Sequence, residues 1–211
     1  MDAAVHREAG IEWSVVARTL PGETVSGDQH LVAKSADGLL MAVIDGLGHG
    51  DEATRAAKTA ADVLADHADE PVVQLMRLCH AALKQTRGAA MTIVSINARR
   101  RTASAVGVGN VETVVVRRDR GPRQVTPPRE TVLLRNGVVG YQLPPLQPCE
   151  IALEPGDVVV FATDGVREDF GERVNAREPL PQLVQGILRQ KFRGTDDALV
   201  LACKILEDYE S

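Results

Sequence analysis

Aromatic residues, lysine and cysteine are scarce in this sequence, and long apolar runs are absent. Phe, Trp and Tyr make up only 3% of the 211 residues, so the core has to be built from Val, Leu, Ile and Ala. No apolar run approaches the about 20 residues that cross a bilayer as a helix, which argues against a membrane partner. The first residues, MDAAVHREAG, lack a basic segment followed by an apolar block, so we expect no secretory signal.

Cysteine usage and net charge narrow the class of protein further. Cys79, Cys149 and Cys203 lie far apart, form no CxxC pair and are odd in number, which favours reduced, mostly buried thiols in a cytoplasmic protein. The formal net charge of −5 argues against nucleic acid as a partner. The apolar fraction of 44% and the charged fraction of 25% are ordinary for a globular protein, and the length favours one domain over residues 1–211.

Apolar periodicity predicts strands on both sides of a helix pair. Two strand-like runs joined at Asp37-Gly38 indicate a hairpin, and alanine and leucine recur at helical spacing between residues 50 and 87. The run at 198–206 fits either a strand or a helix. Further strands are predicted at 11–20, 91–98, 102–109, 111–118, 131–135, 149–153 and 158–163, and a helix at 179–192. This order predicts an α+β fold with two sheets packed on each other and helices outside.

Arginine is concentrated in one segment of the chain. From Arg99 to Arg135 there are nine arginines against three acidic residues, an excess of +6 in an otherwise acidic protein. Such a run is compatible with a solvated face. That is the commoner explanation, and a docking surface for an acidic or phosphorylated partner is the alternative that the sequence leaves open.

Aspartate recurs in turns beside small or polar residues. Each instance alone is compatible with a plain turn. Two of them, however, end apolar strands, where an uncompensated carboxylate is costly, and the chain has only five lysines. Mg²⁺ and Mn²⁺ prefer oxygen ligands, so the combination indicates a metal site in which the Gly46 carbonyl and a bridging Asp45 take part. The turns are Ser26-Gly27-Asp28, Asp45-Gly46, Thr163-Asp164-Gly165 and Thr195-Asp196-Asp197.

These segments resemble the metal-dependent protein phosphatases, the PPM or type 2C family, in their SpoIIE-like bacterial branch. The matching pieces occur in the family's order and cover most of the chain. They are SGD at 26–28, DGLGHG at 45–50, GAAMTIVSI at 88–96, GVGN at 107–110, LEPGDVVVFATDGVRE at 153–168 and GTDDALVLACKI at 194–205. The resemblance implies a four-layer α/β/β/α sandwich of two mainly antiparallel sheets flanked by helix pairs, with a binuclear metal site at one end of the sheets.

The resemblance also implies a set of ligands for two Mn²⁺ or Mg²⁺ ions. Asp45 would bridge the ions and Gly46 would contribute its carbonyl. Asp28 would complete one site, whereas Asp164 and Asp196 would complete the other. The implied reaction is hydrolysis of phosphoserine or phosphothreonine by a water that the two ions activate. Asp197 is expected to support the loop beside the ligands.

Three departures from the family's pattern affect the expected site. No arginine closer than Arg18 precedes Asp28, so the family's phosphate-binding arginine is missing from its usual place. Gln85 stands where many relatives have a carboxylate for a third metal. His49 lies two positions after the family's proton-donating histidine and is interpreted as a loop residue, with proton donation as the alternative; His30 is a weak candidate for a residue supporting the ligands.

The short segment between Asp164 and Asp196, together with the absence of an accessory domain, resembles the feedback phosphatases of bacterial stress signalling. That resemblance implies phosphorylated STAS-domain proteins of the stressosome as partners. The main alternative is a phosphatase-fold module that binds a phosphoprotein without useful turnover, but the four intact aspartates favour an enzyme. A metal-dependent nuclease fits poorly with the acidic charge and the scarcity of aromatic residues.

Overall fold

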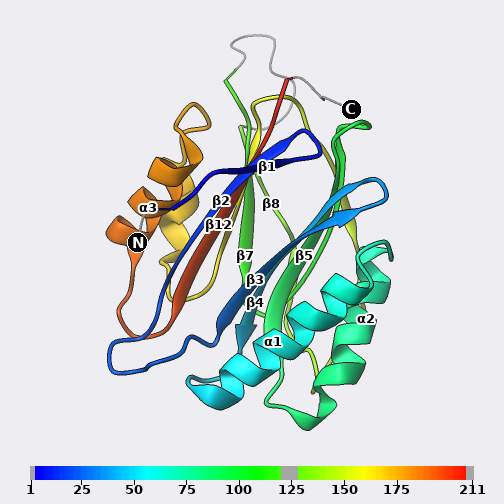
Figure 1. Cartoon of the computed structure of the whole chain (residues 1–211), viewed down its shortest axis with the longest axis vertical. Helices are drawn as coiled ribbons and strands as arrows, with labels where there is room; N and C mark the ends of the chain where they lie inside the picture. Colours follow the sequence, from blue (N-terminus) through cyan, green and yellow to red (C-terminus); the bar gives the residue numbers. More distant parts are fainter. Residues whose placement is uncertain (1–2, 120–127, 208–211) are drawn as a thin grey trace.

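The computed structural model describes residues 3–119 and 128–207 and contains two six-stranded sheets that pack face to face (Figure 1). In the first sheet the strands follow the order β1 (His6–Glu8), β2 (Ile11–Arg18), β12 (Ala198–Ile205), β11 (Val158–Ala162), β7 (Glu112–Val116) and β8 (Arg129–Thr131). The second sheet has the order β10 (Cys149–Ala152), β6 (Thr102–Val108), β5 (Ala89–Asn97), β4 (Gly38–Gly46) and β3 (Asp28–Ser35). Strand β9 (Leu134–Arg135) pairs with β6 in parallel.

Helices cover the outer faces of both sheets (Figure 1). The second sheet is covered by α1 (Asp51–Asp66) and α2 (Val72–Ala82), and α2 continues into the short 3-10 helix η1 (Leu83–Gln85). The first sheet is covered by α3 (Leu180–Lys191) and by the 3-10 helix η3 (Glu168–Arg173). The predicted α/β/β/α sandwich is therefore confirmed, with a 3-10 helix beside α3 on the first sheet. Among the helices that the structure describes, none combines the length and apolar character needed to cross a membrane.

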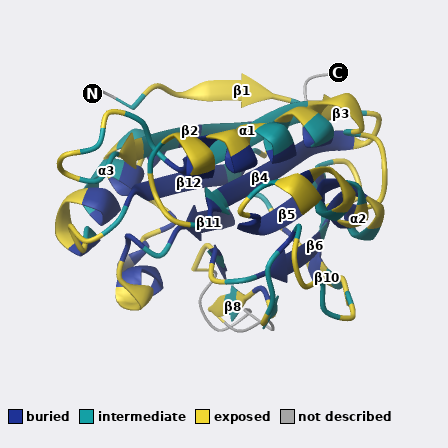
Figure 2. Cartoon of the chain, turned by 90° about the horizontal axis from the view of Figure 1, so that it is seen from below, coloured by how far each residue is buried: buried dark blue, intermediate teal, exposed yellow. Residues whose placement is uncertain are grey.

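The central strands have long apolar sequences because they are buried on both faces (Figure 2). In β4, Leu39, Met41 and Val43 pack between the two sheets. The alternate residues Leu40, Ala42 and Ile44 pack against α1 and α2. Successive side chains of a strand point to opposite faces, so a strand covered on both sides needs an uninterrupted apolar sequence. Strand β12 follows the same rule, which explains why the run at 198–206 lacks the alternation of a half-exposed strand.

The arginine-rich segment does not form one exposed face. Arg117 is only 6% exposed. Its guanidinium donates hydrogen bonds to Asp157 Oδ2 at 3.0 Å and to Glu130 Oε2 at 2.5 Å. The inclusion of Arg117 in a docking surface is therefore wrong, because this side chain stabilises the fold through buried ion pairs. Arg118 is exposed and pairs with Glu207, whereas Arg120 and Arg123 lie outside the described residues.

Candidate metal centre

Asp28 and Asp45 are direct partners at the open end of the β3–β4 hairpin. The antiparallel register pairs Ser35 with Gly38 beside the turn and Asp28 with Asp45 at the other end. Cβ atoms of directly opposed residues lie about 4.5–5.5 Å apart, so the hairpin places the two carboxylates side by side on one face. Asp28 is only 4% exposed, and little water is available to separate the two charges.

The face that carries these carboxylates is the one turned toward the other sheet. Asp45 continues the alternation of Leu39, Met41 and Val43, whose side chains fill the space between the sheets. In the facing sheet, Thr163 continues the alternation of Val159 and Phe161 beyond the end of β11 in the same way. Polar side chains thus replace apolar ones where the inter-sheet core ends. The carboxylates of one sheet and Thr163 of the other sheet face each other there.

Thr163 connects the two sheets at this point. Its hydroxyl donates a hydrogen bond to Asp28 Oδ2 at 2.7 Å and accepts one from the Leu199 N–H at 2.8 Å. Strands β11 and β12 are antiparallel neighbours, so the end of β11 and the start of β12 lie at the same edge of the sheet. This edge places Asp164, Asp196 and Asp197 next to the β3–β4 hairpin.

Asp197 supports the loop that leads to Asp28, as the sequence predicts. Its carboxylate accepts hydrogen bonds from the Gly27 N–H at 2.6 Å and from the Leu20 N–H at 2.7 Å. Asp197 is 3% exposed, so these main-chain donors satisfy it within the protein. With both oxygens engaged, Asp197 organises the loop of residues 20–28 around the candidate ligands.

Gly46 is required by close packing at the end of β4. A Cβ atom at this position would lie 2.1 Å from the Ala53 carbonyl oxygen in the first turn of α1. Gly48 and Gly50 have φ values of +86° and +74°, which glycine adopts without steric cost. The three glycines of DGLGHG therefore bring the chain from β4 into α1 in a tight loop. Coordination by the Gly46 carbonyl stays a prediction.

The predicted ligands lie close enough to affect one another's pKa values, and their joint binding of metal stays a prediction. Burial raises the pKa of Asp45 well above its usual range, and Asp28, Asp164, Asp196 and Asp197 each raise it further. Burial likewise raises the pKa of Asp28, and three of the same carboxylates add to the effect, although the hydrogen bond from the Thr163 hydroxyl opposes it. All four candidate aspartate ligands therefore converge at one end of the sandwich, from both sheets.

Asp164 has partners outside the group of aspartates. Asn110 Nδ2 donates a hydrogen bond to Asp164 Oδ2 at 2.7 Å. Burial and Asp196 raise the pKa of Asp164, whereas Arg193 and the Asn110 amide lower it. The sequence alone indicated no role for Thr163, Asn110 or Arg193. The signals were present for the first two, since Thr163 precedes Asp164 in ATDG and Asn110 ends GVGN.

The composition of the cluster fits hard divalent cations. All the candidate donors are oxygen atoms, and a positive charge would relieve the repulsion that raises the carboxylate pKa values. Within residues 3–119 and 128–207, no three or more His, Cys, Asp or Glu side chains form a set that holds a metal ion as they stand. Mg²⁺ commonly binds through one or two carboxylates and keeps several waters, so two ions shared through Asp45 suit this arrangement.

The other residues singled out in the sequence have less direct positions. His49 Nδ1 lies 2.6 Å from Glu23 Oε1 in a partly exposed pair. Gln85 is an exposed residue of the 3-10 helix η1. His30 packs beside Trp13 with ring centroids 6.4 Å apart. The loop interpretation of His49 agrees with this pairing, and the role of its proton stays a prediction.

The chain forms a sandwich of two sheets between helices, with acidic side chains at one end. This is the fold of the PPM, or type 2C, metal-dependent serine/threonine protein phosphatases. The chain belongs to the SpoIIE family within this class. The sequence model described as Stage II sporulation protein E (SpoIIE) matches residues 35–206, which confirms the resemblance noted in the motifs.

Individual relatives support the same family. The phosphoserine phosphatase RsbX of Bacillus subtilis is 32% identical over 94 residues, which are 44% of this chain and 47% of RsbX, so the match spans about half of that relative. A solved structure described as "The bacterial stressosome: a modular system that has been adapted to control secondary messenger signaling" is 29% identical, with a TM-score of 0.81 over 92% of this chain and 99% of the other. The crystal structure of RsbX with magnesium shares the fold, with a TM-score of 0.83 at 22% identity over 96% and 99% of the two chains.

Proposed function

We propose that this protein hydrolyses phosphoserine or phosphothreonine on partner proteins, with residues 1–211 acting as one phosphatase domain. The observation that carries the proposal is the convergence of Asp28, Asp45, Asp164 and Asp196 from two sheets in a chain of the SpoIIE family. Asp45 is the proposed bridge between two Mn²⁺ or Mg²⁺ ions, and the Gly46 carbonyl completes the set of protein ligands. When bound, the two ions supply a water of lowered pKa and positive charge beside the phosphoryl oxygens.

The residues around the proposed ligands hold them in place. Thr163 orients one oxygen of Asp28, and Asn110 orients one oxygen of Asp164. Asp197 keeps the loop before Asp28 closed against the β12 end of the first sheet. Carboxylates held by such hydrogen bonds lose little further freedom when they bind an ion, which favours a well-defined position for the reacting phosphate.

The proposed substrates are phosphorylated STAS-domain proteins of a stress-signalling complex in the cytoplasm, where the enzyme acts as a feedback regulator. This part of the proposal is supported by the likeness to RsbX and by the 29% identity with the stressosome-associated structure. A phosphatase-fold module that only binds a phosphoprotein is the competing function. All four aspartates are present and affect one another's pKa values, which supports turnover instead.

Phosphate release decides between these two functions. With Mn²⁺, the purified protein should release phosphate from an aryl phosphate and from a phosphorylated STAS-domain protein, and a chelator should abolish both activities. Retention of a bound phosphoprotein without phosphate release would instead identify a binding module. Equal activity with and without chelator would show that the proposed metal centre is wrong.

A further inference from the structure

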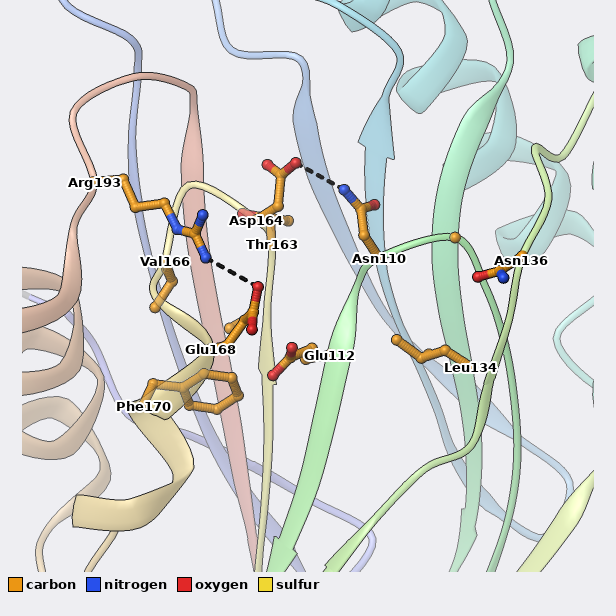
Figure 3. A pocket seen from close by; sticks show the side chains of 12 residues that line it. Asn110, Glu112, Leu134, Asn136, Thr163, Asp164, Val166, Glu168, Phe170 and Arg193 are labelled. Carbon is orange, nitrogen blue, oxygen red and sulfur yellow. Dashed lines mark hydrogen bonds and ion pairs between the residues drawn. The ribbon is translucent and has the colours of Figure 1, made fainter.

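A cavity of about 390 Å³ adjoins the proposed metal centre at Asp164 (Figure 3). Its walls come from the loop after β6 with the start of β7, from β9, from the end of β11 with η3, and from the loop before β12. Leu134, Val166 and Phe170 belong to the apolar part of the lining. The charged part consists of three carboxylates and one arginine: Glu112, Asp164, Glu168 and Arg193. The cavity therefore combines room for a side chain with charged groups beside the predicted site of reaction.

Arg193 is held at this cavity by its main chain. Its N–H donates a hydrogen bond to the Gly165 carbonyl at 2.8 Å, and the preceding residue, Phe192, forms an isolated β-bridge with Val166. Gly165 directly follows Asp164, so these contacts fix the Arg193 backbone beside the candidate ligand. Figure 3 shows the guanidinium pointing into the cavity between Asp164 and Glu168.

The Arg193 side chain is paired with Glu168 in a weak ion pair that a stronger anion can replace. Arg193 Nη2 lies 3.4 Å from Glu168 Oε1, and the two side chains are 39% and 80% exposed. Ion pairs this exposed contribute little to stability. A phosphate dianion binds a guanidinium through short, paired hydrogen bonds, and it would compete well with a single carboxylate at 3.4 Å.

Two other arginines near the site, Arg18 and Arg87, do not line the cavity. Arg18, the arginine nearest in sequence before Asp28, lies over the Phe192 ring at 4.4 Å from its centroid. Arg87 lies beside the glycine loop and pairs with Glu52. Among the described residues that line the cavity, Arg193 is the only cationic side chain.

We propose that Arg193 binds the phosphoryl group of the substrate and that the cavity beside it receives the phosphorylated residue. The inference deepens the proposed phosphatase function and rests on it. Glu168 holds the guanidinium near the site and releases it to the phosphate, while Asp164 and Asn110, which are hydrogen-bonded to each other, line the cavity beside it. An arginine late in the chain thus takes the place of the arginine that the family carries before its first aspartate.

Equilibrium binding of inorganic phosphate to the Mn²⁺-loaded protein tests this role without requiring turnover. Arg193→Gln should weaken phosphate binding about tenfold or more, and Arg193→Lys should fall between this variant and the wild type, because lysine keeps the charge but loses the planar pair of donors. Arg167→Gln is the matched control. Arg167 is 54% exposed, follows the same strand end and donates to the Gln190 carbonyl, but it does not line the cavity.

Two further measurements separate phosphate binding from a structural effect. The Tm of Arg193→Gln should stay at the wild-type value and its Mn²⁺ affinity should not fall, while the KM for an aryl phosphate should rise with the loss of phosphate affinity. Unchanged phosphate affinity, or a parallel loss of Mn²⁺ affinity, would overturn the inference. If the wild type binds phosphate through Arg193 but releases none from any substrate, the phosphatase function fails and the binding role of Arg193 stands.

Discussion

Thr163 and Asp28, which are 135 positions apart in the chain, are joined by a 2.7 Å hydrogen bond between the two sheets. The bond links the end of β11 to the start of β3 at the edge where the inter-sheet core gives way to polar side chains. Because the Thr163 hydroxyl also accepts the Leu199 N–H, it holds three chain segments together. The proposed metal centre therefore depends on the packing of the two sheets.

Removing the Thr163 hydroxyl should weaken both the fold and the metal centre. Thr163→Val leaves the buried Leu199 N–H without its acceptor and Asp28 without its donor, which should cost about 1–3 kcal/mol in the free energy of unfolding. Mn²⁺ affinity should also fall, because Asp28 loses the group that orients it. Denaturant unfolding and calorimetric Mn²⁺ titration measure the two effects. Thr163→Ser keeps the hydroxyl and should resemble the wild type; a Val variant with wild-type Mn²⁺ affinity would contradict this role.

Asp45→Asn should separate activity from stability. Loss of the proposed bridging ligand should lower kcat with Mn²⁺ by at least about 100-fold, since the charge stabilisation at the phosphoryl group is lost. The metal-free variant should nevertheless unfold at a Tm no lower than that of the wild type, because the substitution removes repulsion among the carboxylates. Asp37→Asn, in the exposed hairpin turn, serves as the control. Normal turnover by Asp45→Asn would show that the site is assigned wrongly.

Mn²⁺ should stabilise the protein more at high pH than at low pH. Burial and neighbouring carboxylates raise the pKa values of Asp28 and Asp45, whereas the same groups in the unfolded chain titrate near about 4. At pH values between the unfolded and the folded pKa, the unfolded chain binds fewer protons than the folded one. The free energy of unfolding of the metal-free protein therefore falls as the pH rises. The Mn²⁺-induced rise in Tm should therefore be larger at about pH 8 than at about pH 5. A larger rise at the lower pH would refute the electrostatic argument.

Arg117 and Arg118 should behave differently although they are neighbours in sequence. Arg117→Met removes a buried cation from Asp157 and Glu130 and should cost about 3–5 kcal/mol in the free energy of unfolding. Arg118→Met removes an exposed ion pair with Glu207 and should change stability by less than about 0.5 kcal/mol. Denaturant unfolding of the two variants measures the difference. Equal effects would argue against the buried position of Arg117.

Local sequence determined much of the architecture. An unbroken apolar run identified β11, alanine spacing identified α1, and Asp37-Gly38 identified the β3–β4 hairpin, whereas the run that forms β12 was compatible with a strand or a helix. These features depend on residues that are close in the chain, where periodicity and turn chemistry act directly. The aspartates at the turns were visible for the same reason, and the motifs around them pointed to the family that the comparison confirmed.

The arrangement of the site was decided by tertiary structure. No local pattern predicts the hydrogen bond between Thr163 and Asp28 or the one between Asn110 and Asp164. Nor does any local pattern predict that Arg117 is buried while Arg118 is exposed. Each of these contacts joins different elements, and the first joins different sheets, so it exists only once the aliphatic core has set the register and spacing of the layers. The sequence by itself therefore identified the acidic residues of the site. The packing of the two sheets determined which of them lie together and that the cationic side chain of Arg193 lies beside them.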